Sequence, residues 1–146
     1  MGKHTMLLVV AFLVTAFFGG CQDRGNPSGN GRVPAGSYRY EGYDSKGNSI
    51  VVGTMSFSFV DSVSIRGEWA LEKNGPSDNI GPQIGAGQLT GRVEGQVVSI
   101  NLNPGWVDNN VVLQGSFENE RLRGKWSWIT FAGPTTEGTF DATKIN

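Results

Sequence analysis

The side chains that most often catalyse reactions or hold metal ions are scarce in this sequence. It contains one histidine, His4, and one cysteine, Cys21, and both lie within its first 21 residues. Without an imidazole or a thiol beyond that point, the remainder of the chain is excluded from Ser-His-Asp and Cys-His catalysis, typical zinc sites and disulfides. We therefore expect a non-catalytic protein without a cofactor.

Paired carboxylates are the remaining route to catalysis, because two of them suffice for glycoside hydrolysis. Glu68 and Glu72 fall on the polar face of an alternating segment, and Glu118 and Glu120 fall in a tight turn. Both placements are typical of solvated surface charge. A carboxylate-based hydrolase is therefore disfavoured.

The sequence also gives no sign of an ionic partner. Its formal net charge is −1, which argues against nucleic acid and against electrostatic attraction to anionic lipids. The segments 44–48 and 108–110 hold too few carboxylates for a calcium site. We expect no metal site.

Aromatic and amide side chains offer a binding site instead. Trp106 stands in a polar segment, and an aromatic ring in such a setting is typical of an interface anchor or a sugar-stacking platform. The alternative is that the ring of Trp106 folds back and plugs the domain. The candidate binding residues are Gln83, Trp106, Asp108, Asn109, Asn110, Trp128 and Phe131.

The N-terminal residues 1–20 have the pattern of an export signal. The run from Met6 to Phe18 is apolar apart from Thr15. As a helix it would rise about 20 Å, which is too short for a hydrocarbon core of about 30 Å. This length indicates a signal that is removed rather than a transmembrane span.

The run ends in Phe18-Gly19-Gly20-Cys21, where small residues precede the cysteine. This sequence resembles the lipobox of bacterial lipoproteins, although Phe18 replaces the usual aliphatic residue. The resemblance implies that Cys21 carries fatty acyl chains such as palmitate. Asp after the cysteine favours retention in the inner membrane of enterobacteria, so Gln22 implies the outer membrane. The alternative is a secreted protein with a free thiol.

Residues 21–35 follow as the lipidated cysteine and a tether. This segment is rich in Gly, Pro and Asn and almost free of apolar residues, which is typical of a flexible linker. Its root-mean-square reach is roughly 20 Å. We expect the domain, residues 36–146, to lie close to the membrane.

In residues 36–146, apolar side chains recur at every second position between turn signals, which predicts half-buried antiparallel strands. The clearest hairpin runs from Val51 to Phe59, turns at Asp61-Ser62, and returns from Val63 to Leu71. The remaining runs lie around Tyr38 and Tyr40, Leu89 to Val93, Val98 to Leu102, Val111 to Phe117, Leu122 to Trp128, and Gly138 to Ala142. No segment keeps a helical period, so we predict eight strands and no helix.

Glycine recurs on the inward parity of nearly every strand, at Gly42, Gly53, Gly67, Gly91, Gly115, Gly124 and Gly138. Mid-strand glycine permits the tight coiling of a small barrel. The sequence therefore predicts an all-β, eight-stranded, antiparallel up-and-down β-barrel, with a β-sandwich as the alternative. A membrane-spanning barrel is disfavoured, because glycine interrupts the apolar face.

Two Gly-x-Trp steps, Gly67-Glu68-Trp69 and Gly124-Lys125-Trp126, accompany this periodicity. The combination resembles the lipocalin-like and avidin-like small β-barrels in pattern. Both steps lie mid-chain, so the resemblance implies a fold and no ligand. An eight-stranded barrel has an interior that side chains just fill, which favours a packed core over a ligand cavity.

In an up-and-down barrel alternate connections share one end. The connections after the second, fourth and sixth strands are tight, whereas those after the third, fifth and seventh span 74–86, 103–110 and 131–136. We expect these three loops to form a rim at the end away from the tether. Loops on a rigid scaffold commonly carry binding sites.

These expectations combine into one functional hypothesis, a lipid-anchored, non-catalytic envelope protein that binds a protein or glycan through its long-loop rim. A carrier of a small apolar ligand inside the barrel is one alternative. A purely structural envelope lipoprotein is another.

Overall fold

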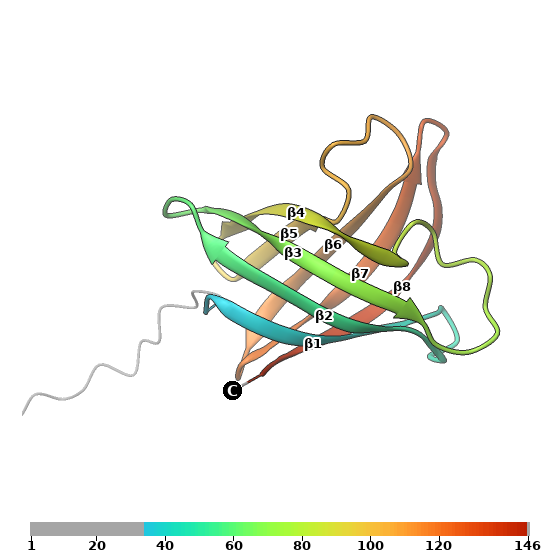
Figure 1. The fold of residues 1–146 in the computed structure, drawn as a ribbon, viewed down its shortest axis with the longest axis horizontal. Coiled ribbons are helices and arrows are strands. Elements are labelled where there is room, and N and C mark those ends of the chain that lie inside the picture. The colour runs from blue at the N-terminus through green and yellow to red at the C-terminus, as the bar shows by residue number, and fades with distance from the viewer. Residues whose placement is uncertain (1–33, 146) are drawn as a thin grey trace, which may run out of the picture.

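The computed structural model describes residues 34–145, which form eight antiparallel strands closed into a barrel (Figure 1). The strands are β1 (Gly36–Tyr43), β2 (Ser49–Phe59), β3 (Ser64–Lys73), β4 (Gly85–Glu94), β5 (Val97–Asn101), β6 (Asn110–Glu118), β7 (Arg121–Thr130) and β8 (Gly133–Lys144). Each strand pairs with the next, and β1 pairs with β8. The predicted up-and-down barrel is confirmed, and the sandwich alternative is wrong.

The predicted export signal, Cys21 and all but the last two residues of the predicted tether lie outside the described residues. Within residues 34–145 the structure contains no helix that is long and apolar enough to cross a membrane.

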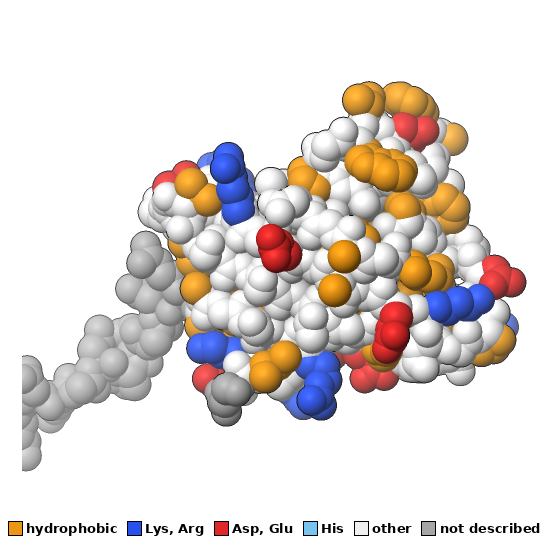
Figure 2. Space-filling model, viewed as in Figure 1, with side chains coloured by type: hydrophobic (Ala, Val, Ile, Leu, Met, Phe, Trp, Pro, Cys, Tyr) orange, Lys and Arg blue, Asp and Glu red, His pale blue; other side chains and the backbone are white. Residues whose placement is uncertain are grey.

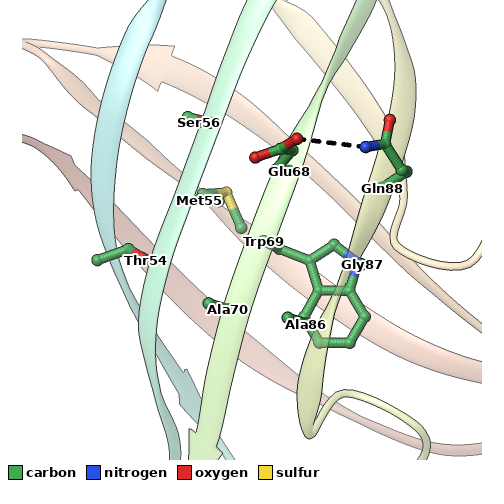
Figure 3. A pocket seen from close by; sticks show the side chains of 9 residues that line it. All are labelled: Thr54, Met55, Ser56, Glu68, Trp69, Ala70, Ala86, Gly87 and Gln88. Carbon is green, nitrogen blue, oxygen red and sulfur yellow. Dashed lines mark hydrogen bonds between the residues drawn. The ribbon is translucent and has the colours of Figure 1, made fainter.

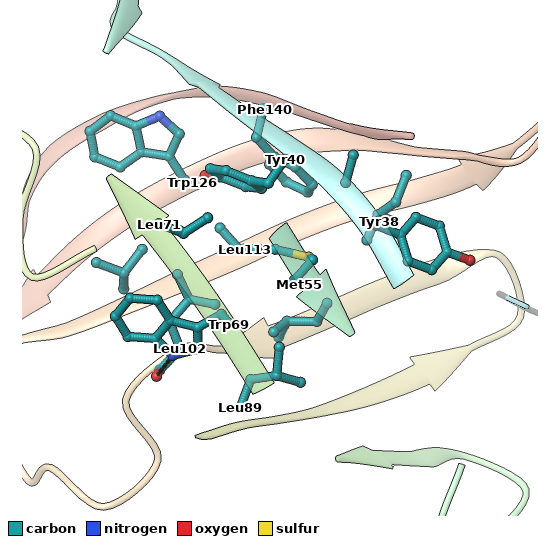
Figure 4. Close-up of a cluster of buried hydrophobic side chains, with 14 of the residues drawn as sticks. Tyr38, Tyr40, Met55, Trp69, Leu71, Leu89, Leu102, Leu113, Trp126 and Phe140 are labelled. Atoms are coloured by element: carbon teal, nitrogen blue, oxygen red, sulfur yellow. Dashed lines mark hydrogen bonds between the residues drawn. The ribbon is translucent and has the colours of Figure 1, made fainter. Parts of the chain in front are cut away.

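The apolar face of each strand points into the barrel, as the alternation predicts. Met55 of β2 lies opposite Trp69 of β3, and both are buried, whereas the next pair, Ser56 and Glu68, faces outward. Figure 4 shows how the inward side chains from different strands meet in one cluster. The ring of Tyr38 stacks on Phe57 with centroids 4.6 Å apart. The centre of the barrel is therefore occupied by protein side chains.

Two turns at opposite ends of the barrel are held by aspartate. The Asp61 carboxylate accepts hydrogen bonds from the backbone N–H groups of Val63 and Ser64, at 2.8 and 2.7 Å, and closes the β2–β3 hairpin. Asp44 closes the β1–β2 turn by accepting from Asn48, and these bonds lower the pKa of the Asp44 carboxyl. Segment 44–48 is thus a hairpin turn.

The connection between β7 and β8 differs from its expected form. The sequence predicts a loop over 131–136, but the structure has a two-residue turn, Phe131 and Ala132, and β8 begins at Gly133. The predicted loop is therefore wrong. Residues 133–137 are exposed or half-buried on both faces, because this part of the hairpin extends beyond the barrel core. Their pairing with β7 leaves no apolar alternation for a sequence pattern to detect.

Candidate binding surface

Two long loops and two short turns meet at one end of the barrel. We call three of these connections the rim: loop 74–84 between β3 and β4, loop 102–109 between β5 and β6, and the turn 131–132 between β7 and β8; the β1–β2 turn, residues 44–48, lies at the same end. The start of β1 and the end of β8 lie at the opposite end, as the position of the C-terminus in Figure 1 shows. The rim therefore faces away from the point where the N-terminal segment enters the barrel.

Asp108 and Asn109 join two of these connections through hydrogen bonds. The Asp108 carboxylate accepts from the backbone N–H of Phe131 at 2.8 Å and from that of Asn109 at 2.7 Å. The Oδ1 atom of Asn109 accepts from the indole Nε1 of Trp128 at 2.5 Å. Asn109 has a φ of 67°, which asparagine tolerates better than most residues. Loop 102–109 is thereby fixed to the β7–β8 hairpin.

Asn110 holds the tip of the same loop. Its side-chain nitrogen donates to the backbone carbonyl of Trp106 at 3.0 Å, and the N–H of Trp106 donates to the carbonyl of Asn103 at 3.1 Å. The side-chain oxygens of Asn103 and Asn110 are buried and have no hydrogen-bond partner among the described residues. These bonds fix the backbone of Trp106 and leave its ring free to face outward.

Four apolar side chains stand exposed on this frame. Trp106 is 57% exposed, Val107 87%, Phe131 80% and Ile84 48%. Figure 2 shows hydrophobic atoms gathered over the protruding β5–β6 loop and the β7–β8 turn. The backbone N–H of Phe131 donates a hydrogen bond to Asp108, which follows Val107 in the sequence. The side chains of Phe131 and Val107 therefore come from adjacent segments. We call Ile84, Trp106, Val107 and Phe131 the apolar rim.

Loop 74–84 closes the barrel mouth, a role that the sequence analysis considered for Trp106. Ile80 and Gln83 are buried, Gln83 completely. The Gln83 side chain donates to the carbonyl of Ile80 at 2.5 Å and accepts from the Tyr40 hydroxyl at 3.3 Å. Burial raises the pKa of Tyr40 above its usual range. Gln83 is therefore a buried bridge beneath the rim and does not belong to its surface.

Trp128 also packs beneath the rim. A Cβ placed on Gly81, which has a φ of +65°, would lie 2.8 Å from Cγ of the Trp128 ring. Glycine at this position therefore lets loop 74–84 lie directly against Trp128. Because the indole nitrogen also donates to Asn109, Trp128 connects both long loops. Its role is to support the apolar rim from below.

A cleft of about 340 Å³ opens between the two long loops. It is lined by the buried side chains of Trp69 and Leu102, by Ala86 and Gln88 of β4, and by the exposed Trp106. Ile84 of the apolar rim also borders it. We call this the rim cleft.

The rim cleft continues into a shallow groove of about 440 Å³ on the outer face of β2, β3 and β4. Figure 3 shows the small side chains of Thr54, Ser56 and Ala70 that line it. Gln88 lines both depressions and donates to the Glu68 carboxylate at 3.3 Å. Glu68 is thus the charged group at the junction of cleft and groove.

Acidic side chains outnumber basic ones around this end. Glu68 and Glu72 lie on the outer face of β3, towards the long loops, while Lys73 is engaged in an ion pair with Asp78. This contact lowers the pKa of Asp78. The arginines nearest the short turns at the far end are Arg66, Arg92, Arg121 and Arg123. A partner of the rim therefore meets a mainly acidic border.

The structure brings together six of the seven residues that the sequence analysis nominated, and it places Gln83 inside. Trp106 and Phe131 present exposed rings, whereas Asp108, Asn109, Asn110 and Trp128 form the supporting frame. Val107 and Ile84 lie in the predicted rim loops but were not among the nominated residues. An apolar residue directly after a tryptophan in a polar turn, and another between Gln83 and Gly85, are the signals that could have revealed them.

No family model, no curated protein and no solved structure matches this chain. Among residues 34–145 no three His, Cys, Asp or Glu side chains lie close enough together to hold a metal ion.

Proposed function

We propose that this protein is a lipid-anchored, non-catalytic binding protein of the bacterial envelope, and that it holds a protein partner through its apolar rim. The observation that carries this proposal is the exposure of Trp106, Val107 and Phe131 on a hydrogen-bonded frame. Contiguous exposed apolar side chains in a soluble domain are typical of interaction sites. Because the backbone that carries these aromatic side chains is already held by hydrogen bonds, little backbone entropy is lost on binding.

The composition of the rim favours a protein over a glycan. A sugar-stacking platform needs an aromatic face bordered by free polar groups, whereas Trp106 and Phe131 are accompanied by Val107 and Ile84. The polar groups of Asp108 and Asn109 are already engaged in the frame. The exposed apolar neighbours Val107 and Ile84 suit the desolvated centre of a protein interface.

The alternative of an apolar carrier has less support. The barrel interior is filled by side chains such as Tyr40, Met55 and Trp126, and Gln83 closes the mouth above them. A carrier would need space that these side chains occupy.

Anchoring follows from the predicted lipobox. Acylated Cys21 would attach the chain to the outer membrane, and the rim, at the end away from β1, would face the periplasm or the cell exterior. Metabolic labelling with radioactive palmitate tests this step. The full chain is expected to incorporate label and Cys21→Ser to lose it, and label that persists in C21S would refute lipidation.

Site-specific photo-crosslinking in intact cells tests the rim. A benzophenone side chain at Val107 is expected to give a discrete crosslinked protein species. The matched control is the same side chain at Val60, which is also exposed but lies in the β2–β3 turn at the opposite end. Equal products from both positions, or none from Val107, would overturn the proposed binding surface.

A further inference from the structure

β4 is longer than the strand that should cover it. The pairing of β4 with β5 begins at the Glu94–Val97 pair and stops at the Thr90–Asn101 pair. On its other side β4 continues to pair with β3 as far as Gly85. Residues 85–89 of β4 therefore have a strand neighbour on one side only.

The direction of the free backbone groups follows from the antiparallel ladder. The N–H of Val93 donates to Val63 on the β3 side. Alternate residues of a central strand bond to opposite neighbours, so Ala86 and Gln88 direct their N–H and C=O groups towards the side where β5 has ended. Within residues 34–145 no backbone hydrogen bond meets them there.

Trp69 closes the barrel wall behind this edge. Its indole Nε1 donates to the carbonyl of Leu102, the first residue after β5, at 2.6 Å. A Cβ on Gly87 would lie 3.0 Å from this nitrogen, so the ring lies directly behind the backbone of β4, as Figure 3 shows. The side chain thus takes the place of strand pairing in sealing the core. The backbone groups of Ala86 and Gln88 stay available on the outside.

A row of free N–H and C=O groups on a strand edge is complementary to an extended polypeptide. Here the edge runs along the rim cleft, so a strand added to it would lie between Gln88 and Trp106. One of its side chains would enter the cleft, where Trp69, Leu102 and Trp106 favour an apolar residue. The side chains of the other parity would face outward.

Charge defines a second feature of the occupant. Glu68 and Gln88 are joined by a hydrogen bond on the outer face beside this edge. Glu72 lies further along the same face of β3. β4 lies between the added strand and β3, about two strand spacings or 10 Å in all. Only a long outward side chain such as lysine or arginine can reach across Gln88 to Glu68, and its positive charge complements that carboxylate.

We propose that the β4 edge from Ala86 to Gln88 accepts an extended segment of the protein partner as an additional strand. This segment places an apolar side chain in the rim cleft and a lysine or arginine beside Glu68. The inference rests on the proposed function, because Trp106 belongs both to the apolar rim and to the cleft.

The test uses the mature acylated protein in detergent micelles and a fluorescent, capped peptide in which valine alternates with threonine and lysine. Two controls isolate backbone pairing. One peptide of the same sequence carries N-methyl groups on alternate amides, which removes its hydrogen bonds. The variant Ala86→Pro removes one N–H of the edge, whereas Ala86→Thr keeps it with similar bulk.

The peptide is expected to bind the wild-type protein, and A86T, which keeps the N–H but alters a side chain that lines the cleft, is expected to bind it more tightly than A86P. A86P and N-methylation are each expected to weaken binding by about tenfold or more, which corresponds to about 1.4 kcal/mol. The β3–β4 ladder stays intact in A86P, because this N–H points away from β3, and proline is tolerated at such edge positions. Hydrogen exchange of the wild-type protein gives a readout that does not depend on A86P folding: the Ala86 and Gln88 amides should become protected when peptide is added.

Absence of peptide binding, equal binding of the N-methylated peptide, or unchanged exchange at Ala86 and Gln88 would overturn the inference. A concentration-dependent dimer abolished by A86P would also overturn it, since the occupant would then be a second copy of this chain. The two proposals fail separately. If crosslinking from Val107 persists in A86P, the rim remains the binding surface and the strand-pairing mode is wrong. If no crosslinked product forms from Val107 in the wild-type protein, the proposed function is wrong, whether or not the peptide binds the β4 edge.

Discussion

Single side chains of the rim divide into those that face solvent and those that hold the frame. Asp108 belongs to the second kind, because one carboxylate oxygen accepts from two backbone N–H groups in different segments. Asp108, Asn109 and Asn110 were predicted to take part in binding because they lie close to Trp106 in the sequence. Their supporting role depends on contacts with β7 and the β7–β8 turn, which no local pattern contains.

Asp108→Ala is expected to lower the free energy of unfolding by about 0.5–1.5 kcal/mol, because the hydrogen bonds from the N–H groups of Asn109 and Phe131 are lost while water can still reach these exposed or partly buried groups. Asp108→Asn is the matched control, since an amide oxygen of the same shape still accepts. Urea unfolding followed by tryptophan fluorescence measures both. Equal stability of D108A and the wild type would mean that this frame does not hold the loop.

A second prediction at the residue scale concerns the buried indole of Trp69. Trp69→Phe removes the indole N–H that caps the Leu102 carbonyl, and a buried acceptor left unpaired costs about 1–3 kcal/mol. The same variant should speed hydrogen exchange in residues 85–89 of β4, because the ring lies directly behind them. Trp106→Phe, on the exposed surface, is expected to change stability by less than about 0.5 kcal/mol. If exchange in β4 does not change in W69F, the indole is not what closes the wall.

At the scale of elements, the strands follow from alternation because one face of each is buried against a common core. The hairpin of β2 and β3 shows this directly, since every inward position from Met55 to Phe59 has a partner on β3 that the sequence also assigned inward. Pattern analysis fails where both faces are exposed, as in the first residues of β8. The pattern of one strand also does not predict where its neighbouring strand ends. For this reason the unpaired edge of β4, which begins where β5 ends, was not predicted.

The inward glycines are a feature of the strands that the sequence revealed and the structure explains. A Cβ on Gly67 of β3 would lie 1.7 Å from the carbonyl oxygen of Ser56 and 2.8 Å from Cα of Phe57, both backbone atoms of β2. The two strands therefore coil too closely for any side chain at this position.

Gly67→Ala is expected to destabilise the barrel by about 1–3 kcal/mol or more, because backbone must shift to admit the methyl group. Gly105→Ala is the control, since a Cβ at Gly105 meets no atom within 4 Å and its φ is not in the positive range. Chemical denaturation gives both values. If G67A and G105A unfold at the same urea concentration, the close approach of β2 and β3 is not a constraint on the fold.

Residues 34–145 form a barrel with two unlike ends around one core of packed side chains. The tight turns after β2, β4 and β6 lie at the end where β1 begins, together with Arg92 and Arg123, which form ion pairs with Glu94 and Asp141. The two long loops and the apolar rim lie at the other end. This polarity follows from the up-and-down order of the strands, because the longer connections after β3 and β5 fall at the same end. The sequence was sufficient to predict that the two long loops share one end, but it did not predict how charge is distributed between the ends. Which loop fills the barrel mouth was not predictable, since Ile80 and Gln83 carry no pattern that distinguishes them from surface residues.

The same core predicts how the molecule responds to alkali. Burial, with a smaller contribution from Glu120, raises the pKa of Tyr38 to about 12, and burial raises that of Tyr40 as well. An unfolded tyrosine ionises near 10, so between pH 10 and 12 the unfolded chain binds fewer protons than the folded one. The stability that arises from the neutral, buried tyrosines is complete below pH 10, and it is lost as the pH rises through the pKa values of Tyr38 and Tyr40 in the folded protein.

The expected result is a fall in the free energy of unfolding above pH 10, accompanied by phenolate absorbance that develops together with unfolding. Tyr40→Phe removes one of the buried ionising groups, so the slope of stability against pH above 10 should become shallower than in the wild type, even though the variant loses the contact with Gln83 at neutral pH. Urea denaturation at several alkaline pH values, with absorbance at the phenolate band, measures both quantities. A wild-type protein that ionises its tyrosines near pH 10 while still folded would show that these rings are open to solvent and that the barrel is not closed around them.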